Sequence, residues 1–210
     1  MNENQLREQI AMIGKSLYER GLAHGSAGNI SVKLADGWLM TPTNSCLGRL
    51  DPARISRLDA DGSLIAGDPP SKEAFLHIAV YQERAASGAV VHLHSAHAVA
   101  VSCMDGLNPR NVFPPITAYA VMQVGRLALV PYHPPGDPSL AEAVRKLAGR
   151  HHALLLANHG PVVAGSSLDA AAGAIEELEQ TARLMLLLQG HPVRFLTPEQ
   201  VTELERRFAG

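Results

Sequence analysis

The sequence predicts a single α/β sandwich with a mostly antiparallel sheet. Segments with helical periodicity alternate with short β-rich runs along the 210 residues, which indicates helices packed on a sheet. The dipeptide Asp36-Gly37 separates two of these runs and favours a hairpin, so neighbouring strands are expected to run antiparallel. The length suits one domain, residues 1–210, with enough chain to bury a substantial core.

The first half of the chain is expected to form two helices and a hairpin. One apolar face recurs through the first segment, at Leu6, Ile10, Ile13 and Leu17. Positions 30–34 alternate apolar and polar side chains as a half-buried strand does, and 38–40 return after the turn. A polar loop at 41–49 and a short strand at 63–66 follow. The next helix is expected to begin near Ser71, with Glu73 in its first turn, where the helix dipole favours an anion.

The second half is expected to add further strands and the longest helix. Residues 107–119 contain Pro109, Pro114 and Pro115 and are predicted to be a loop. The longest helix is predicted over 168–189 and ends before Gly190. Thr197 and Gln200 are spaced for a capping box, which predicts a last helix. Strands are predicted at 89–94, 127–130, 153–157 and 162–163, with helices from about 95 and at 139–149.

Composition excludes several classes of protein. The hydrophobic share of 46% and the charged share of 18% belong to a folded globular chain. A net charge of -2 predicts no nucleic-acid partner and no attraction to anionic membranes. No apolar run approaches the ~18 residues that span a bilayer, and the N-terminal segment lacks the apolar core of a signal peptide. With only Cys46 and Cys103, too few for a disulfide scaffold, a cytoplasmic location is expected.

Ten histidines stand out in the composition, and their spacing predicts a metal site. His92 and His94 are two apart in a predicted strand, so both imidazoles point to one face and can bind one ion. His159 follows another predicted strand and is the best candidate for a third ligand. Three nitrogens leave open positions for water or substrate, which is typical of catalytic metal sites. Glu73 is expected as a fourth ligand that substrate displaces.

Each of these residues also has a simpler interpretation. An H-x-H pair is common in strands, so the two histidines can be hydrogen-bonded groups at a polar sheet edge. Glu73 can serve only to stabilise a helix dipole. His77 follows Glu73 by one helical turn and is a candidate hydrogen-bond partner for it, and His97 is expected to cap or pack. The metal interpretation depends on four side chains coming together from separate segments.

Three loops carry the groups that bind a small anion. Gly28-Asn29, Thr43-Asn44 and Ser71-Lys72 offer backbone N–H groups, hydroxyls and amides, and the last pair precedes a predicted helix. Gly, Asn and Ser are also the usual residues of turns, and most lysines are only solvated. These loops therefore predict a phosphate site only in combination with the metal site.

Five motifs, taken in order, resemble those of the class II aldolase/adducin family. The resemblance covers nearly the whole chain, and the combination is highly specific. It implies a three-layer α/β/α sandwich, a fourfold homotetramer and active sites at subunit interfaces. The motifs are GSAGNIS at 25–31, MTPTN at 40–44, PPSKE at 69–73, VVHLHSAHA at 90–98 and LLANHGPVV at 155–163.

The resemblance implies a role for each candidate residue. The ligands of a zinc ion would be His92, His94 and His159, with Mn²⁺, Co²⁺ and Fe²⁺ as alternative metals. Glu73 would be the catalytic acid/base and would also touch the metal in the resting enzyme. Tyr119 would donate a proton, in the site of a neighbouring subunit. The phosphate-binding residues would be Asn29, Thr43, Asn44, Ser71 and Lys72.

Two features favour a decarboxylase branch of this family over its aldolases. Thr43-Asn44 and Lys72 differ from the residues that the aldolases usually carry, and PSKE with GPVVAG is more similar to the decarboxylases. That similarity implies a small phosphorylated sugar acid, 3-oxo-tetronate 4-phosphate, which yields dihydroxyacetone phosphate and CO₂ through a metal-stabilised enediolate. Lys72 supplies positive charge for a substrate with both a carboxylate and a phosphate, and Arg49 is a second candidate. The alternatives are an L-fuculose-phosphate-type aldolase and, as a non-enzyme, an adducin-like structural module.

Overall fold

The computed structural model describes residues 1–134 and 136–208. The strands in this part of the chain form one sheet, in which all neighbours pair antiparallel except the sixth and seventh strands, which are parallel. The mostly antiparallel sheet is therefore confirmed. The strands are β1 (Asn29–Leu34), β2 (Gly37–Met40), β3 (Ser56–Asp59), β4 (Leu64–Ala66), β5 (Ala89–His92), β6 (Ala128–Val130), β7 (Ala153–Leu156) and β8 (Gly160–Gly165), in the spatial order β4-β3-β2-β1-β5-β8-β7-β6.

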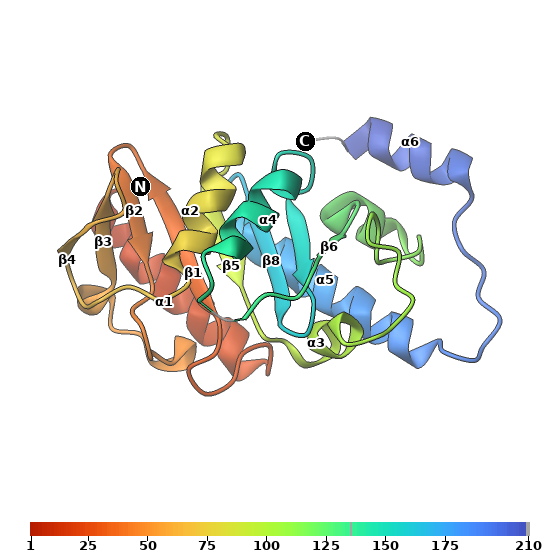
Figure 1. The fold of residues 1–210 in the computed structure, drawn as a ribbon, viewed down its shortest axis with the longest axis horizontal. Helices are drawn as coiled ribbons and strands as arrows, with labels where there is room; N and C mark the ends of the chain where they lie inside the picture. Colours follow the sequence, from red (N-terminus) through yellow and green to blue (C-terminus); the bar gives the residue numbers. More distant parts are fainter. Residues whose placement is uncertain (135, 209–210) are drawn as a thin grey trace.

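Helices cover both faces of the sheet, which gives the three layers of an α/β/α sandwich (Figure 1). The short turns are η1 (Leu47–Arg49), η2 (Pro52–Arg54) and the π-helical η3 (Ala120–Val124). The helices are α1 (Glu3–Glu19), α2 (Ala74–Glu83), α3 (Ala96–Ser102), α4 (Ser139–Ala148), α5 (Leu168–Leu187) and α6 (Pro198–Phe208). Among the described residues, none of these helices combines the length and the apolar character needed to cross a bilayer.

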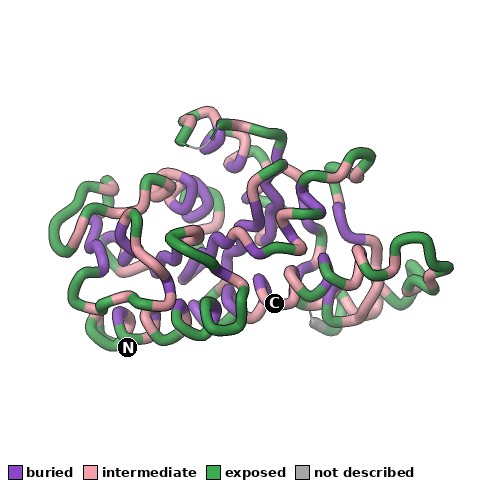
Figure 2. Tube along the Cα trace, turned by 90° about the horizontal axis from the view of Figure 1, so that it is seen from below, coloured by how far each residue is buried: buried purple, intermediate pink, exposed green. Residues whose placement is uncertain are grey.

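Two apolar clusters fill the space on either side of the sheet. One cluster packs α1, α3 and α5 against strand residues such as Val91 and Val163. The other packs α2 and α4 against their neighbours Val90 and Val162. This division follows from the pleat, because successive strand residues point to opposite faces. Figure 2 shows the resulting pattern, with buried positions through the middle of the trace and exposed positions around it.

Most predicted elements are confirmed, and their caps explain where they begin. The hairpin joins β1 and β2 with Leu34 opposite Gly37. The longest helix is α5, which begins at the side-chain cap of Ser167. The capping box before α6 is present, since Thr197 and Gln200 exchange side-chain and backbone hydrogen bonds. Strand β3 was not predicted from its short, charged sequence, SRLD.

Two predicted boundaries at the candidate site are wrong by a few residues. Helix α2 begins at Ala74 and not near Ser71, because the Ser71 N–H donates to the Thr41 carbonyl 3.1 Å away and holds that residue in the neighbouring loop. Strand β5 ends at His92 and not at residue 94. Beyond it, the Leu93 N–H still donates to the Pro161 carbonyl, after which the chain turns into α3.

Candidate metal centre and substrate pocket

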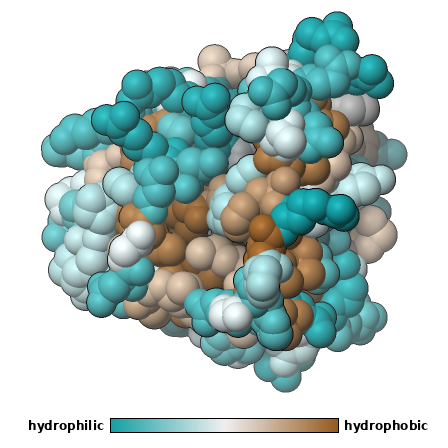
Figure 3. All heavy atoms as spheres, turned by 90° about the vertical axis from the view of Figure 1, so that its right-hand side faces the viewer, coloured by the Kyte–Doolittle hydropathy of each residue, from teal (hydrophilic) through white to brown (hydrophobic). Residues whose placement is uncertain are grey.

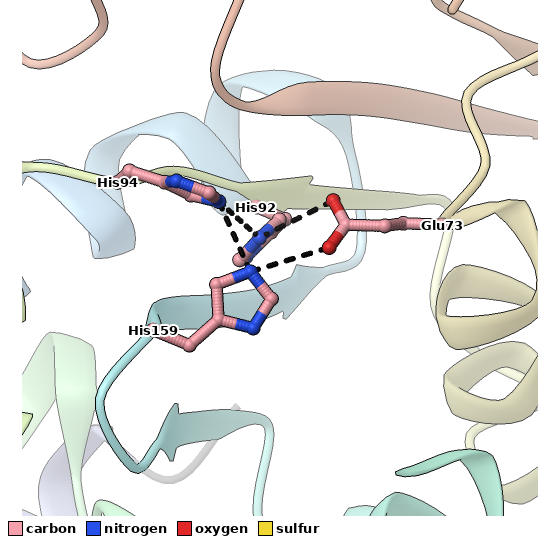
Figure 4. A group of neighbouring side chains, drawn as sticks. All are labelled: Glu73, His92, His94 and His159. Carbon is pink, nitrogen blue, oxygen red and sulfur yellow. Dashed lines mark hydrogen bonds and ion pairs between the residues drawn. The ribbon is translucent and has the colours of Figure 1, made fainter. Parts of the chain in front are cut away.

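Four side chains from three parts of the fold converge at one point (Figure 4). His92 ends β5 and His94 follows it, His159 lies in the turn between β7 and β8, and Glu73 immediately precedes α2. The Nε2 atom of His94 lies 3.0 Å from Nε2 of His92 and 3.1 Å from Nε2 of His159. The Glu73 oxygens lie 3.5 Å from Nε2 of His92 and 3.2 Å from Nε2 of His159. The ligand atoms of all four residues are within 4.8 Å of one another.

The turn that carries His159 depends on its two neighbours. Asn158 has a φ of 56°, a left-handed conformation that asparagine adopts more readily than most residues. Gly160 lies against β5 so closely that a Cβ atom there would be 2.4 Å from the Leu93 carbonyl oxygen. The Asn-His-Gly sequence therefore lets the turn press His159 against the end of β5.

The ring of His92 is oriented by the backbone of β8. Its Nδ1 atom lies 2.8 Å from the Pro161 carbonyl oxygen. Because a carbonyl only accepts, Nδ1 carries the proton and Nε2 turns its lone pair to the centre of the cluster. A metal-ligating histidine is commonly fixed in this way through its second nitrogen.

The donor set fits a divalent transition metal. Metal–nitrogen bonds of about 2.0–2.1 Å place ligand nitrogens about 3.3 Å apart in a tetrahedron and about 2.9 Å apart at adjacent octahedral positions. The observed separations of 3.0 and 3.1 Å lie between these values. Three imidazoles and one carboxylate are suited to Zn²⁺, Mn²⁺, Co²⁺ or Fe²⁺. Glu73, His92, His94 and His159 can therefore hold a metal ion.

Electrostatics keep the histidine lone pairs available. Burial lowers the pKa of His92 to about 4, with the neighbouring His94 and His159 adding to the decrease and Glu73 opposing it. The pKa of His94 is also lowered, first by burial and then by His159. Burial acts to raise the pKa of Glu73, but the neighbouring His159, His92 and Asn29 outweigh it and hold this pKa below its usual range. At neutral pH the carboxylate of Glu73 is therefore ionised beside two neutral imidazoles.

A cavity of about 810 Å³ opens beside the four-residue cluster. The loops with the predicted anion-binding residues are tied together around it, because the Thr43 N–H donates to the Pro69 carbonyl over 2.9 Å. Asn44 has a φ of 55°, which Asn tolerates, and this turns the loop toward the cavity. The cavity is lined by Glu73, His94 and His159 and by all of the predicted phosphate-binding residues, Asn29, Thr43, Asn44, Ser71 and Lys72.

Four other residues considered in the sequence do not line this cavity. The side chain of Tyr119 is 61% exposed and does not line this cavity of the described chain, so a role for it would lie elsewhere. Arg49, at the end of η1, does not line the cavity either. His77 does not hydrogen-bond to Glu73 as suggested, but to Asn29 and Ser31. His97 donates to Glu179, which also accepts from two N–H groups at the start of α3.

Three residues that the sequence did not indicate also line the cavity. They are His24, Tyr132 and His133, in loops without a recognisable motif. His133 lies in a proline-rich turn, where its Nδ1 atom is 2.7 Å from the Ser139 hydroxyl. Only the packing of these loops against the cluster places them at the site, so no local pattern predicts them.

The sequence and fold match known proteins over nearly their full length. The model of the class II aldolase and adducin N-terminal domain matches residues 8–186. The chain belongs to the class II aldolase and adducin family. It is 50% identical to the 3-oxo-tetronate 4-phosphate decarboxylase of Escherichia coli (strain K12), over 96% of each chain. It is 32% identical to the L-fuculose phosphate aldolase of the same strain, over 99% of this chain and 96% of the other.

A solved structure of this family has the same fold. The crystal structure of YgbL from Klebsiella pneumoniae superposes with a TM-score of 0.95 at 51% identity, covering 97% of this chain and 99% of that one. The α/β/α class is therefore confirmed. Metal dependence is a property of class II aldolases, and the cluster of Glu73 with three histidines provides a possible metal site in this member.

Proposed function

We propose that this chain is a metal-dependent lyase that decarboxylates a 3-oxo-tetronate 4-phosphate. The observation that carries the proposal is the 50% identity, over 96% of both chains, to an enzyme of that name. The identity to L-fuculose phosphate aldolase is only 32%. The convergence of a metal-binding cluster and anion-suited loops on one cavity supports a phosphorylated substrate that chelates a metal.

The cavity offers separate groups to the two ends of such a substrate. We infer that the phosphate binds the hydroxyls of Thr43 and Ser71 and the backbone N–H of Asn44, which lie on two linked loops. Lys72 is exposed at the same cavity and makes no ion pair within the described residues, so its charge is available to the substrate. The side-chain amide of Asn29 is occupied, because it bonds to both Glu73 and His77. Asn29 would therefore contact a phosphate only through its backbone.

The reaction requires the loss of CO₂ and the addition of one proton. The bond between C1 and C2 of the β-keto acid breaks, and its electrons form an enediolate across C2 and C3. A divalent metal held by the three histidines would supply positive charge where the negative charge develops. Glu73 points toward the histidines and lines the cavity beside His94 and His159, so its carboxylate can take a proton from water and deliver it to C2. The product is then dihydroxyacetone phosphate.

We propose Zn²⁺ as the resident metal, on the basis of the histidine-rich donor set. Metal analysis of the purified protein tests this assignment. Stoichiometric zinc is the expected result. If the analysis finds stoichiometric Mn²⁺, Co²⁺ or Fe²⁺, that metal takes the place of zinc in the assignment. A protein that binds no divalent metal, and gains no activity when one is added, would instead favour the adducin-like structural module.

We further propose that this single domain forms a cytoplasmic homotetramer in which Tyr119 serves a neighbouring site. Tyr119 is exposed and lies away from its own cavity, as a residue that acts in another subunit would. Leu187 and Phe195, near the end of α5, are also exposed. Figure 3 shows apolar side chains gathered within a polar rim on that side of the molecule, a pattern that marks contact surfaces. Mass measurement in solution and the kcat of Tyr119→Phe test the assembly and the role separately.

The decisive experiment is a substrate assay of the purified protein. With 3-oxo-tetronate 4-phosphate, we expect CO₂ and dihydroxyacetone phosphate in equal amounts. L-fuculose 1-phosphate serves as the competing substrate. Rapid reversible cleavage of that sugar phosphate, without decarboxylation of the tetronate, would identify an aldolase instead.

Two variants test the assigned roles. Glu73→Gln should keep the metal and lose most turnover, since proton transfer by a positioned side chain contributes about 10²–10⁴-fold. Lys72→Ser should raise KM for the doubly anionic substrate, whereas Lys146→Ser, an exposed lysine of α4, should not. A normal rate for Glu73→Gln would refute its acid/base role.

A further inference from the structure

Behind Glu73, buried polar side chains form a row between α2 and β1. Glu73, His77 and Tyr81 are spaced four residues apart and share one face of the helix and its entry. Asn29 and Ser31 are two apart on β1 and face them. Only 1% of His77 and 4% of Tyr81 is exposed. The row therefore leads from the cavity into the interior.

Hydrogen bonds join each neighbour in this row. Nδ2 of Asn29 donates to Oε2 of Glu73 over 2.7 Å. Oδ1 of Asn29 lies 2.6 Å from Nε2 of His77, and Nδ1 of His77 lies 2.7 Å from the Ser31 hydroxyl. The Tyr81 hydroxyl lies 2.9 Å from the same Ser31 oxygen. No polar side-chain atom in the row lacks a partner.

The ionised carboxylate of Glu73 fixes the direction of every bond. Since a carboxylate only accepts, Asn29 must turn its amide nitrogen to Glu73 and its oxygen to His77. His77 must then carry its proton on Nε2 and accept from Ser31 at Nδ1. Burial lowers the pKa of His77 to about 3, with the nearby His92 adding to the decrease, so the ring is neutral as this pattern requires.

We propose that His77 is a positioning residue that orients Glu73 through Asn29. Its Nε2–H holds the amide in the one orientation that donates to the carboxylate. Without this donor, the amide can rotate and present its oxygen to Glu73, which would repel the carboxylate from its place beside the histidines. The proposal rests on the acid/base role proposed above for Glu73. Loss of such an outer partner typically costs about 10–100-fold in activity.

Kinetics of three variants and one control test the proposal. His77→Leu removes the donor and should lower kcat about 10–100-fold, with little change in KM. His77→Gln places an amide N–H near the position of Nε2 and should restore most of the loss. In a Glu73→Gln background, His77→Leu should cause no further loss of kcat, because the effect passes through that carboxylate. Val80→Ala, which loosens the packing of the same helix, should leave kcat unchanged.

A spectroscopic readout is independent of the reaction. Ring ¹⁵N chemical shifts of the protein as purified should show His77 neutral and protonated at Nε2. In Asn29→Leu, the acceptor for this proton is lost, and the proton should no longer be confined to Nε2. Absence of CO₂ from the wild-type protein would refute the proposed function, while these shifts still test the hydrogen-bonded row. A charged or Nδ1-protonated His77, an unchanged kcat in His77→Leu, or an equal loss in the Glu73→Gln background would each overturn the proposal. If His77→Leu does not fold, His77→Gln and the ¹⁵N shifts decide.

Discussion

Replacement of Gly160 by alanine tests how the turn between β7 and β8 places His159. A Cβ atom at Gly160 would lie 2.4 Å from the Leu93 carbonyl oxygen, where ordinary contacts begin at 3.4 Å. The turn must therefore move by about 1 Å relative to β5. Overpacking of this kind costs about 1–3 kcal/mol of folding free energy. The same movement pulls His159 away from His94, so Gly160→Ala should weaken metal binding as well as stability.

The assay combines thermal unfolding with metal titration against a competing chelator. The matched control is Gly173→Ala, because no heavy atom lies within 4 Å of a Cβ atom placed there, inside α5. That replacement should stabilise the protein by up to about 1 kcal/mol through helix propensity and leave metal affinity unaltered. If Gly160→Ala binds metal as tightly as the wild type, the close contact does not position His159, and this reasoning is wrong.

Three further outcomes are expected. His94→Ala should lose metal and activity together, because two remaining imidazoles hold the ion much less tightly; retention of stoichiometric metal would contradict this. Removal of the metal by a chelator should abolish turnover and lower Tm, and readdition should restore both. The reason is that a ligand bound only by the folded state stabilises that state. An unchanged Tm would argue against a metal site in the folded protein. The His77 pKa of about 3, against an ordinary value of 6.5, means that the unfolded chain binds more protons between these pH values, so stability falls as pH falls through this range. At pH 5 the loss of stability is about 2 kcal/mol. Urea denaturation at pH 8 and pH 5 measures the difference in unfolding free energy, which His77→Gln should reduce by that amount. The same pH dependence in the wild type and the variant would refute this prediction.

Local patterns were sufficient for the parts of the fold that local physics controls. The period of α1, the Asp36-Gly37 hairpin and the capping box at Thr197 depend on neighbouring residues, and each is present. The start of α2 was misplaced because a contact from a distant loop, the Thr41 carbonyl, holds Ser71 out of the helix. Strand β3 has little apolar character of its own and is specified by its pairing with β2.

The candidate site divides in the same way. The spacing of His92 and His94 predicted two side chains on one face, and their ring nitrogens do meet. His159 and Glu73 could be named as candidate ligands from their positions after a strand and before a helix, but no local rule brings residues so far apart in sequence together, and the resemblance to a family supplied that link. His133 had no signal of either kind, and the side-chain contacts of Asn29 with Glu73 and His77 became visible only in three dimensions.

The position of β5 in the sheet has a consequence for how the site can open. At His92 the backbone pairs with Asn29 of β1 on one side and with Val162 of β8 on the other. An amide in the middle of a sheet exchanges its hydrogen only when a large part of the structure unfolds. The histidine end of the site should thus belong to the slowest-exchanging unit of the protein, whereas the loop at Thr43 and Asn44 should exchange readily. Substrate specificity can then change in the loop while the metal-binding strand keeps its place.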